Sequence, residues 1–442
     1  MDVSLARILV CLFAGIGLIV LLTAKYRVHA FFALILACLI VGLGVGMPVD
    51  AVLTSVKDGF GNILKSLGLI IVLGTTLGAV LEHTGCTSVM ANSILKQIGS
   101  KRANLAMSLT GLIVGLPIFC DSGYIVLSGL NKSLARSSGI AMAVMATSLA
   151  TGLYSVHCLI PPHPGASAAA ALIGVDYGRL IITGTLVAIP AMLVGYFWAG
   201  YSGKKYPDVV TETEEAPTEP AYLPSALKAF LPVAIPILLI AVKAFFVIDT
   251  VAPNKWLTMF LSLGDPAIAL AIGILLAFNA GSNWRKDAVA KLLQDGAEKA
   301  GGILVIIGAG GAFGAVLAAT KIGGHLSAAL PLASMGLFFP FLITFIIKTA
   351  QGSSTVAIIT AASIVLPLLK PLGLDTATGH LLGVLAMGAG SMMISHANDA
   401  YFWVIAKFSG LEMKTMLGVY SVSTVLMGLT SFAMVYLLSF IL

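Results

Sequence analysis

Charged residues are scarce in this chain of 442 residues, because Asp, Glu, Lys and Arg together make up only 10%. A soluble domain carries about 25% charged residues. Hydrophobic residues make up 58%, so the chain cannot cover a water-facing surface and is predicted to cross a membrane many times. The net charge of +6 comes from Lys and Arg in short loops beside apolar runs. That placement is an orientation signal and no sign of nucleic-acid binding.

Catalytic and cofactor motifs are missing as well. The sequence has no P-loop, HExxH, CxxC or G-x-S-x-G pattern, so it lacks the usual signatures of ATP coupling, metal-dependent hydrolysis and serine hydrolases. The five cysteines are odd in number and have no metal-ligand spacing. We therefore predict free core cysteines, no metal, no cofactor, no enzymatic activity and no nucleic-acid partner.

A polar segment divides the chain almost in half. Residues 203–224, GKKYPDVVTETEEAPTEPAYLP, are acidic and proline-rich, which is typical of a linker. It separates a first repeat, 1–202, from a second repeat, 225–442. The stretches at 58–85 and 295–323 share a DG opening, a GAVL motif and a closing glycine. We predict that the two halves arose by duplication.

Each half is predicted to be all-α and to contain about five spans, one re-entrant hairpin and one broken helix. The hairpins are placed at 104–130 and 333–369, because each holds two apolar pieces shorter than the ~20 residues of a comfortable span. Two full spans apiece is the alternative. The broken helices are placed at 139–175 and 379–404. An odd number of crossings inverts the second half, and inverted repeats with broken helices are the pattern of secondary transporters.

The two helix breaks mark the candidate binding site. They read LYSVHCLIPPHPGAS at 153–167 and GSMMISHANDAYFW at 390–403. Freed backbone groups survive in a membrane only inside protein or beside a water-filled cavity. In the first break, prolines end one half-helix and Gly165 allows the turn, so the amides of the next half-helix form an anion site. We predict that the breaks face each other and hold a small anion.

Further ligands are expected from the two hairpin tips, placed at residues 120–123 and 351–355. Their hydroxyl, amide and carboxylate groups suit a polyol acid. The predicted substrate-binding residues are Asp121, Ser122, Gly123, His163, Gly165, Ala166, Ser167, Gln351, Gly352, Ser353, Ser354, Thr355, His396 and Asn398.

Five side chains are candidates for carrying a coupling proton, namely Asp121, His157, His163, His396 and Asp399. A carboxylate inside a membrane is costly and can take a proton from one side and release it to the other. Histidine has an ordinary pKa of about 6.5 and serves the same purpose. The two carboxylates can also cap helices by accepting hydrogen bonds from backbone amides, and the two roles do not exclude each other. Glu82, at the end of a span, is interpreted as an interfacial residue.

Four motifs make the sequence similar to the gluconate permease (GntP) family of proton-coupled symporters, within the ion-transporter superfamily. They are GLPIFCDSG at 115–123, SVHCLIPPHPG at 155–165, KTAQGSSTVAIITAA at 348–362 and SHANDAYFW at 395–403. The resemblance covers the whole chain. It implies uptake of sugar acids or small hydroxy or amino acids with a proton, across a bacterial inner membrane. It also implies a homodimer in which hairpins and broken helices slide, elevator-like, against a static scaffold.

Two departures from the family pattern fall at the expected site. Gluconate carriers have an aromatic pair and a larger residue within the segment that reads FCDSG at 119–123 here, and glycine in place of Tyr401. These changes leave room for a shorter substrate such as glycerate, 3-hydroxybutyrate or D-serine. Sodium coupling and a passive anion channel remain alternatives. A lipid-modifying enzyme is disfavoured by the lack of a nucleophile or metal set.

Overall fold

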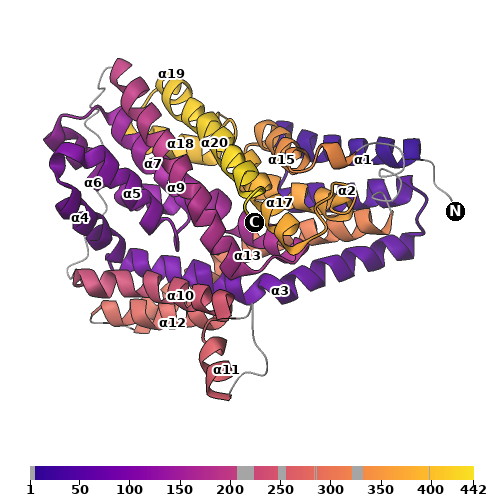
Figure 1. Cartoon of the computed structure of the whole chain (residues 1–442), viewed down its shortest axis with the longest axis horizontal. Coiled ribbons are helices and arrows are strands. Elements are labelled where there is room, and N and C mark those ends of the chain that lie inside the picture. Colours follow the sequence, from indigo (N-terminus) through magenta and orange to yellow (C-terminus); the bar gives the residue numbers. More distant parts are fainter. Residues whose placement is uncertain are drawn as a thin grey trace.

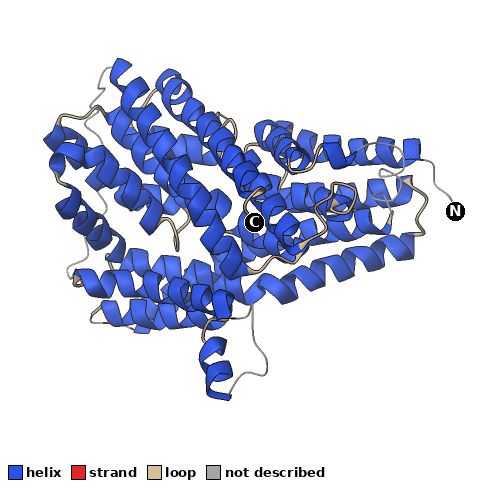
Figure 2. Ribbon diagram, viewed as in Figure 1, coloured by secondary structure: helices blue, strands red, loops and turns tan. Residues whose placement is uncertain are grey.

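The computed structural model describes residues 5–206, 223–246, 255–282, 284, 286–320, 332–397 and 399–442. Every regular element within these ranges is a helix (Figure 2), which confirms the predicted all-α fold. Seven helical stretches of the described chain are long and apolar enough to cross a bilayer. The protein is therefore a polytopic membrane protein. Most of the predicted linker, residues 207–222, lies outside the described residues.

Two unusually long helices run side by side through the molecule (Figure 1). They are α3 (Val49–His83, 35 residues) and α13 (Lys286–Ala319, 34 residues). At a rise of 1.5 Å per residue each is about 50 Å long, more than the ~30 Å hydrocarbon core. Glycines allow their backbones to touch, because a Cβ on Gly59 would lie 2.4 Å from the carbonyl oxygen of Gly311. The predicted duplication had matched parts of these same two helices.

The first hairpin and first break lie between α3 and the linker. Helices α5 (Ala103–Val114) and α6 (Cys120–Ser138) form the hairpin, and α7 (Met142–Leu159) and α8 (Pro164–Ile173) form the broken helix. All residues of α7 are buried. Pro161 and Pro162 lack backbone N–H groups, so α7 ends at Leu159, and Pro164 opens α8 at a position that tolerates proline.

The second hairpin and second break repeat this order near the C-terminus. The hairpin consists of α15 (Phe338–Gln351) and α16 (Ser354–Val365), and the broken helix of α17 (Ala377–Met392) and α18 (Ala400–Ser409). Gly352 turns the hairpin with φ +91°, a backbone conformation that favours glycine. The second break contains no proline. Ile394 has φ +41° there, and Asp399 caps the helix that follows.

The hairpin turns differ from the predicted tips. The first turn lies at residues 115–119, GLPIF, and the predicted tip at 120–123 instead forms the first turn of α6. Pro117 explains the shift, because it blocks continuation of α5, and extended Phe119 precedes α6 as its N-cap. The second turn is narrower than predicted and consists of Gly352 and Ser353.

The remaining helices surround these elements. At the N-terminus, α1 (Leu5–Val20) continues into a π-helical turn, η1 (Leu21–Lys25), and packs on α2 (Ala30–Gly44). The others are α4 (Cys86–Ile98), α9 (Tyr177–Ser202), α10 (Ala226–Phe246), α11 (Lys255–Ser262), α12 (Pro266–Ala280), α19 (Met413–Met416), π-helical η6 (Leu417–Ser421) and α20 (Val422–Leu438). Short 3-10 turns occur at Ser100–Arg102, Gly203–Lys205, Leu332–Ser334 and Leu366–Leu368. The pair α10 and α12 lies along one side of α3 (Figure 1).

Candidate functional site

Four helix N-termini meet inside the protein in two pairs. The start of α8 packs against the start of α16, and a Cβ added to Gly165 would lie 3.3 Å from Thr355 Cα. Helix α6 packs against α18, and the ring centroids of Tyr124 and Tyr401 are 6.1 Å apart. Each break therefore meets the hairpin of the other half. Helix N-termini carry partial positive charge and unpaired amide donors, which favour an anion.

The histidines of the two breaks each contact a backbone carbonyl oxygen at or near the end of the first hairpin helix in their own half. His163 Nε2 lies 2.8 Å from the Gly115 carbonyl oxygen, and His396 Nε2 lies 3.1 Å from that of Thr349. A carbonyl oxygen only accepts, so each Nε2 donates, and Nδ1 of the neutral ring is an acceptor. His163 Nδ1 has no partner among the described residues. This atom is available to a hydroxyl group of a ligand.

A buried ion pair joins the second hairpin to the second break. Lys348 Nζ lies 3.0 Å from Asp399 Oδ2, and the exposed fractions of the two side chains are 0% and 8%. Asp399 also accepts hydrogen bonds from the hydroxyl of Ser395 and from the backbone N–H of Tyr401, the latter at 3.0 Å. Asp399 is thus a helix cap, which the sequence allowed, and also an ion-pair partner, which it did not predict.

The second break is fixed to the end of the chain through Ser395. Its backbone N–H donates to Thr424 Oγ1 at 3.0 Å, and its carbonyl oxygen accepts from the hydroxyl of Ser421. Ser421 ends η6 and Thr424 belongs to α20. Since Ser395 in turn donates to Asp399, the C-terminal helix positions the carboxylate of the ion pair.

A row of buried aromatic rings connects the two breaks. The ring centroids of His163 and His157 are 4.9 Å apart, those of His157 and Tyr154 6.3 Å, and those of Tyr154 and Tyr401 5.8 Å. The Tyr154 hydroxyl donates to the Ser391 carbonyl oxygen at 3.1 Å. The predicted proton-coupling histidines of the first break therefore lie in one continuous row with the tyrosine that follows Asp399.

Several of the predicted site residues carry buried polar atoms without a hydrogen-bond partner. Among the buried side-chain polar atoms of the described chain that have no hydrogen-bond partner are Asp121 Oδ1, His157 Nδ1, Ser167 Oγ and Gln351 Nε2; others lie outside the predicted site, such as Thr87 Oγ1 and Thr110 Oγ1. Burying a polar atom unpaired costs about 1–3 kcal/mol, and native proteins rarely leave such atoms unpaired. Asp121 also lies close enough to Asp399 for the two charges to interact. The first four atoms belong to residues predicted for substrate or proton binding.

Other predicted ligands have packing or capping contacts. Gly123 faces α7, where an added Cβ would lie 2.8 Å from Leu153 Cδ2. Ser353 Oγ accepts the backbone N–H of Val356 at 3.3 Å and so caps α16. The predicted ligands Gly165, Ala166, Ser167, Gly352 and Ser354 are buried between the paired helix starts, and Thr355 is half-buried there. Asn398 lies outside the described residues.

Lys348 is the site residue that sequence reasoning missed. It stands in the otherwise apolar helix FFPFLITFIIKTAQ, and a lysine inside a membrane segment is as costly as a carboxylate. The embedded charges predicted from the sequence were acidic side chains only. The same reasoning applied to Lys and Arg would have singled out this residue, although its pairing with Asp399 across 51 positions could not be read from the sequence.

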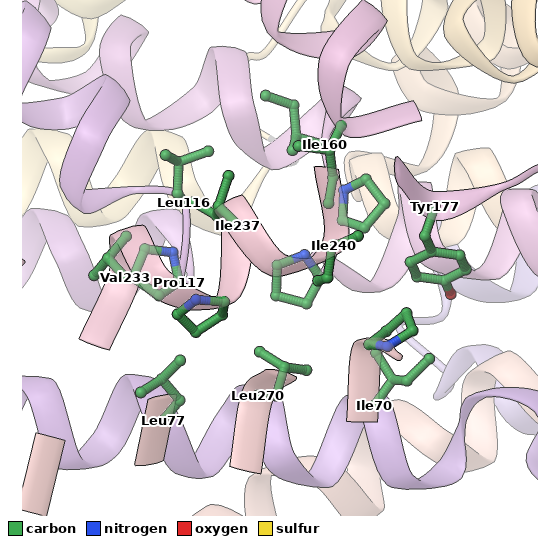
Figure 3. Close-up of a pocket in the computed structure, with 15 residues that line it drawn as sticks. Ile70, Leu77, Leu116, Pro117, Ile160, Tyr177, Val233, Ile237, Ile240 and Leu270 are labelled. Atoms are coloured by element: carbon green, nitrogen blue, oxygen red, sulfur yellow. The ribbon is translucent and has the colours of Figure 1, made fainter. Parts of the chain in front are cut away.

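Two cavities flank the first hairpin turn. The one in Figure 3 encloses about 510 Å³ of space, part of it open to the surroundings, and its lining is apolar. Residues Leu116, Pro117, Ile160, Pro161 and Pro162 line it on one side, and residues of α3, α10 and α12 on the other. A hydroxy acid would find almost no polar partner there.

The second cavity is smaller, and its lining includes charged and hydroxyl groups. It encloses about 250 Å³, and Glu82, Ser122 and Lys299 are among the residues that line it. It lies where the first hairpin turn meets α3, so Ser122 faces this cavity. Glu82 is half-buried and interacts electrostatically with Lys299.

Comparison with known proteins defines the class. The family model for GntP family permeases matches residues 7–441. The chain is 33% identical to the gluconate permease of Pseudomonas aeruginosa, covering 97% of this chain and 96% of the relative. It is 31% identical to the Gnt-II system L-idonate transporter of Escherichia coli K12, covering 95% and 96%. The solved Alcanivorax borkumensis YdaH transporter is similar in fold, with a TM-score of 0.66, 18% identity, and coverage of 93% of this chain and 98% of that one.

The all-helical membrane fold with paired helix breaks, together with these relatives, defines a membrane permease, a class of transporters and not of enzymes. The chain belongs to the GntP family of permeases. The resemblance noted in its four motifs is thereby confirmed. At 18% identity the likeness to YdaH shows the fold alone.

Proposed function

We propose that this permease is a secondary active transporter that imports a small hydroxy-carboxylate or sugar-acid anion by proton symport. The observation that carries the proposal is the buried site between the breaks. It combines helix N-termini and the Lys348 ammonium, which suit a carboxylate, with unpartnered atoms of His163, Ser167 and Gln351, which suit hydroxyl groups. Relatives named for gluconate and L-idonate transport support the substrate class.

The proposed substrate ligands are the fourteen residues predicted from the sequence, with Lys348 added. Asp121, His157, His163, His396 and Asp399 are the proposed proton carriers, and Asp399 is favoured because it forms an ion pair with a buried lysine. We also propose the inverted duplication of residues 1–202 and 225–442. A homodimer in a bacterial inner membrane completes the proposal.

An elevator-type movement is the proposed transport step. The first hairpin turn and the first break meet α3, α10 and α12 largely through apolar side chains (Figure 3). Such a surface favours sliding, because apolar contacts are non-directional and re-form in a new register.

Uptake into proteoliposomes tests the function. Purified protein is offered D-gluconate, L-idonate, D-glycerate, D-3-hydroxybutyrate and D-serine, each under an inside-alkaline pH gradient and under a sodium gradient. We expect accumulation of at least one acid above the external concentration with the pH gradient alone. Accumulation that depends only on the sodium gradient would show that sodium, and not the proton, is the coupling ion. Equilibration without accumulation would identify a channel or uniporter.

The same compounds are screened by thermal unfolding of the detergent-solubilised protein. A ligand that binds the folded state at 100 times its Kd stabilises it by about 2.7 kcal/mol. The ranking of the five compounds therefore identifies the substrate independently of transport.

A further inference from the structure

A lysine without solvent exposure faces the carboxylate of the second break. The Lys348 side chain is 0% exposed, and its ammonium has three donors. Among the described residues, Asp399 is its hydrogen-bond partner, at 3.0 Å. The other donors are therefore available to a ligand that carries acceptor oxygens.

The pair also connects two elements that frame the site. Lys348 lies in the last turn of α15, just before the hairpin turn, and Asp399 caps α18 just after the break. Neither charge is stable alone in this environment, because a buried charge without a partner does not recover its lost hydration. Any event that removes one partner must supply another.

The geometry points to a charge exchange at this pair: the substrate carboxylate replaces Asp399 on the Lys348 ammonium, and Asp399 takes up the coupling proton. This inference rests on the proposed proton symport and names the residue that receives the substrate carboxylate. In the substrate-free site, ammonium and carboxylate cancel. In the loaded site, the ammonium pairs with the substrate, and Asp399 is a neutral acid.

Net charge then enforces the coupling. The substrate-free site and the fully loaded site are both neutral. An anion bound without a proton leaves one net negative charge, and a proton bound without an anion leaves one net positive charge. Both partly loaded states carry a buried net charge, which is costly inside a membrane protein. Only the neutral states cross, so one proton accompanies one monoanion and no net charge moves.

Other ionisable groups face Asp399 from the surrounding elements. They are Asp121 and Cys120 of α6, Tyr154 of α7 and Tyr420 of η6. Thiols and phenols are ordinarily neutral at physiological pH, so Asp121 is the competing proton acceptor. The variant Asp121→Asn therefore accompanies Asp399→Asn in every measurement.

The membrane potential distinguishes this inference from symport in general. Proteoliposomes accumulate the monoanions D-gluconate, D-glycerate and D-3-hydroxybutyrate under a fixed pH gradient, with a potassium diffusion potential of about 100 mV set separately. One net transported charge would change the accumulation ratio about 50-fold at this potential. We expect less than a twofold change. A change near 50-fold overturns the neutral exchange and leaves proton symport standing, whereas no accumulation of any acid counts against the proposed function itself.

Substitutions of the two ion-pair partners are expected to cause different transport defects. In Asp399→Asn the substrate-loaded site is neutral, but the substrate-free site keeps the unpaired Lys348 ammonium. Exchange of labelled for unlabelled substrate in preloaded vesicles is therefore expected to continue, while net uptake driven by the pH gradient is lost. Lys348→Met weakens substrate binding about 10- to 100-fold, the loss of one charge-assisted hydrogen bond. Lys348→Arg restores part of the binding. Accumulation that survives in Asp399→Asn but is lost in Asp121→Asn would overturn the assignment to Asp399.

Matched controls guard against misfolding. Lys407→Met removes an exposed lysine of α18, and Asp375→Asn an exposed acid before α17; both are expected to transport normally. The double variant Lys348→Met/Asp399→Asn replaces the ion pair by neutral groups and is expected to fold, because it leaves no unpaired charge. It should unfold near the wild-type temperature yet fail to bind the acids. Normal binding by this variant would contradict the inference.

Discussion

The Tyr401 hydroxyl donates a hydrogen bond to the carbonyl oxygen of Ala150, 3.2 Å away. This contact holds a large ring between the second break and α7, where the ring also stacks on Tyr154. Tyr401 therefore fills the space between the second break and α7.

We expect Tyr401→Gly to shift the preference from short acids toward six-carbon acids by about tenfold, the scale on which pocket size discriminates substrates. The ratio of initial uptake rates for D-gluconate and D-glycerate measures the shift. Tyr401→Phe keeps the ring and serves as the control, with an unchanged ratio. An equal ratio in all three proteins would show that the ring does not set substrate length.

The contact between His163 and the Gly115 carbonyl oxygen predicts a stability effect. His163→Ala removes the donor and leaves a buried carbonyl unpaired, so we expect a loss of about 1–3 kcal/mol in unfolding free energy. Unfolding of the detergent-solubilised protein measures it. His380→Ala, whose 3.9 Å contact with exposed Asp375 is weak, should change stability by less than about 1 kcal/mol. Equal effects of the two variants would contradict the prediction.

Glycine at position 152 lets α7 approach α5. A Cβ there would lie 2.1 Å from the Ser108 carbonyl oxygen, so Gly152→Ala forces the two helices apart. Overpacking of this kind costs about 1–3 kcal/mol. Gly200→Ala in α9 is the matched control, because its Cβ would meet nothing within 4 Å. Thermal unfolding of both variants decides the matter, and a fully stable Gly152→Ala would count against the close contact.

A reversible cross-link tests the proposed sliding of the first hairpin. A Cβ on Gly78 of α3 would lie 3.8 Å from Ile118 Cα, which suits a disulfide between cysteines placed at the two positions. In a background without the five native cysteines, we expect oxidation of Gly78→Cys/Ile118→Cys to stop transport and reduction to restore it. Either single variant serves as the control. Undiminished transport by the oxidised protein would show that this hairpin does not move against α3.

Local sequence was sufficient to predict the breaks. Prolines 161, 162 and 164 end and restart a helix for a steric reason that does not depend on the rest of the chain. The second break was predicted without a proline, from the polar run SHAND inside an apolar stretch, and α17 ends at Met392 and α18 begins at Ala400 on either side of that run. The first hairpin turn was placed several residues late, because polarity was followed there in preference to the helix-breaking Pro117.

The arrangement of the site depended on contacts that no local pattern encodes. The crossing of α8 with α16 and of α6 with α18 joins segments far apart in sequence. The pairing of Lys348 with Asp399 is of the same kind. The short helix α4, CTSVMANSILKQI, was missed because it is too polar to register as a span.

Two hydrogen bonds connect Ser395 of the second break to the C-terminal helices, so the position of α20 is expected to reflect the position of the break. The Ser395 amide donates a hydrogen bond to Thr424, and its carbonyl oxygen accepts one from Ser421. A rotation of the second break must therefore move α20 with it or break both hydrogen bonds. We expect a movement of the second break to be transmitted through these two hydrogen bonds to α20, which ends at Leu438. A fluorophore attached near the end of α20 and a second one on α3 would report rotations at the ion pair as changes in the distance between the two labels.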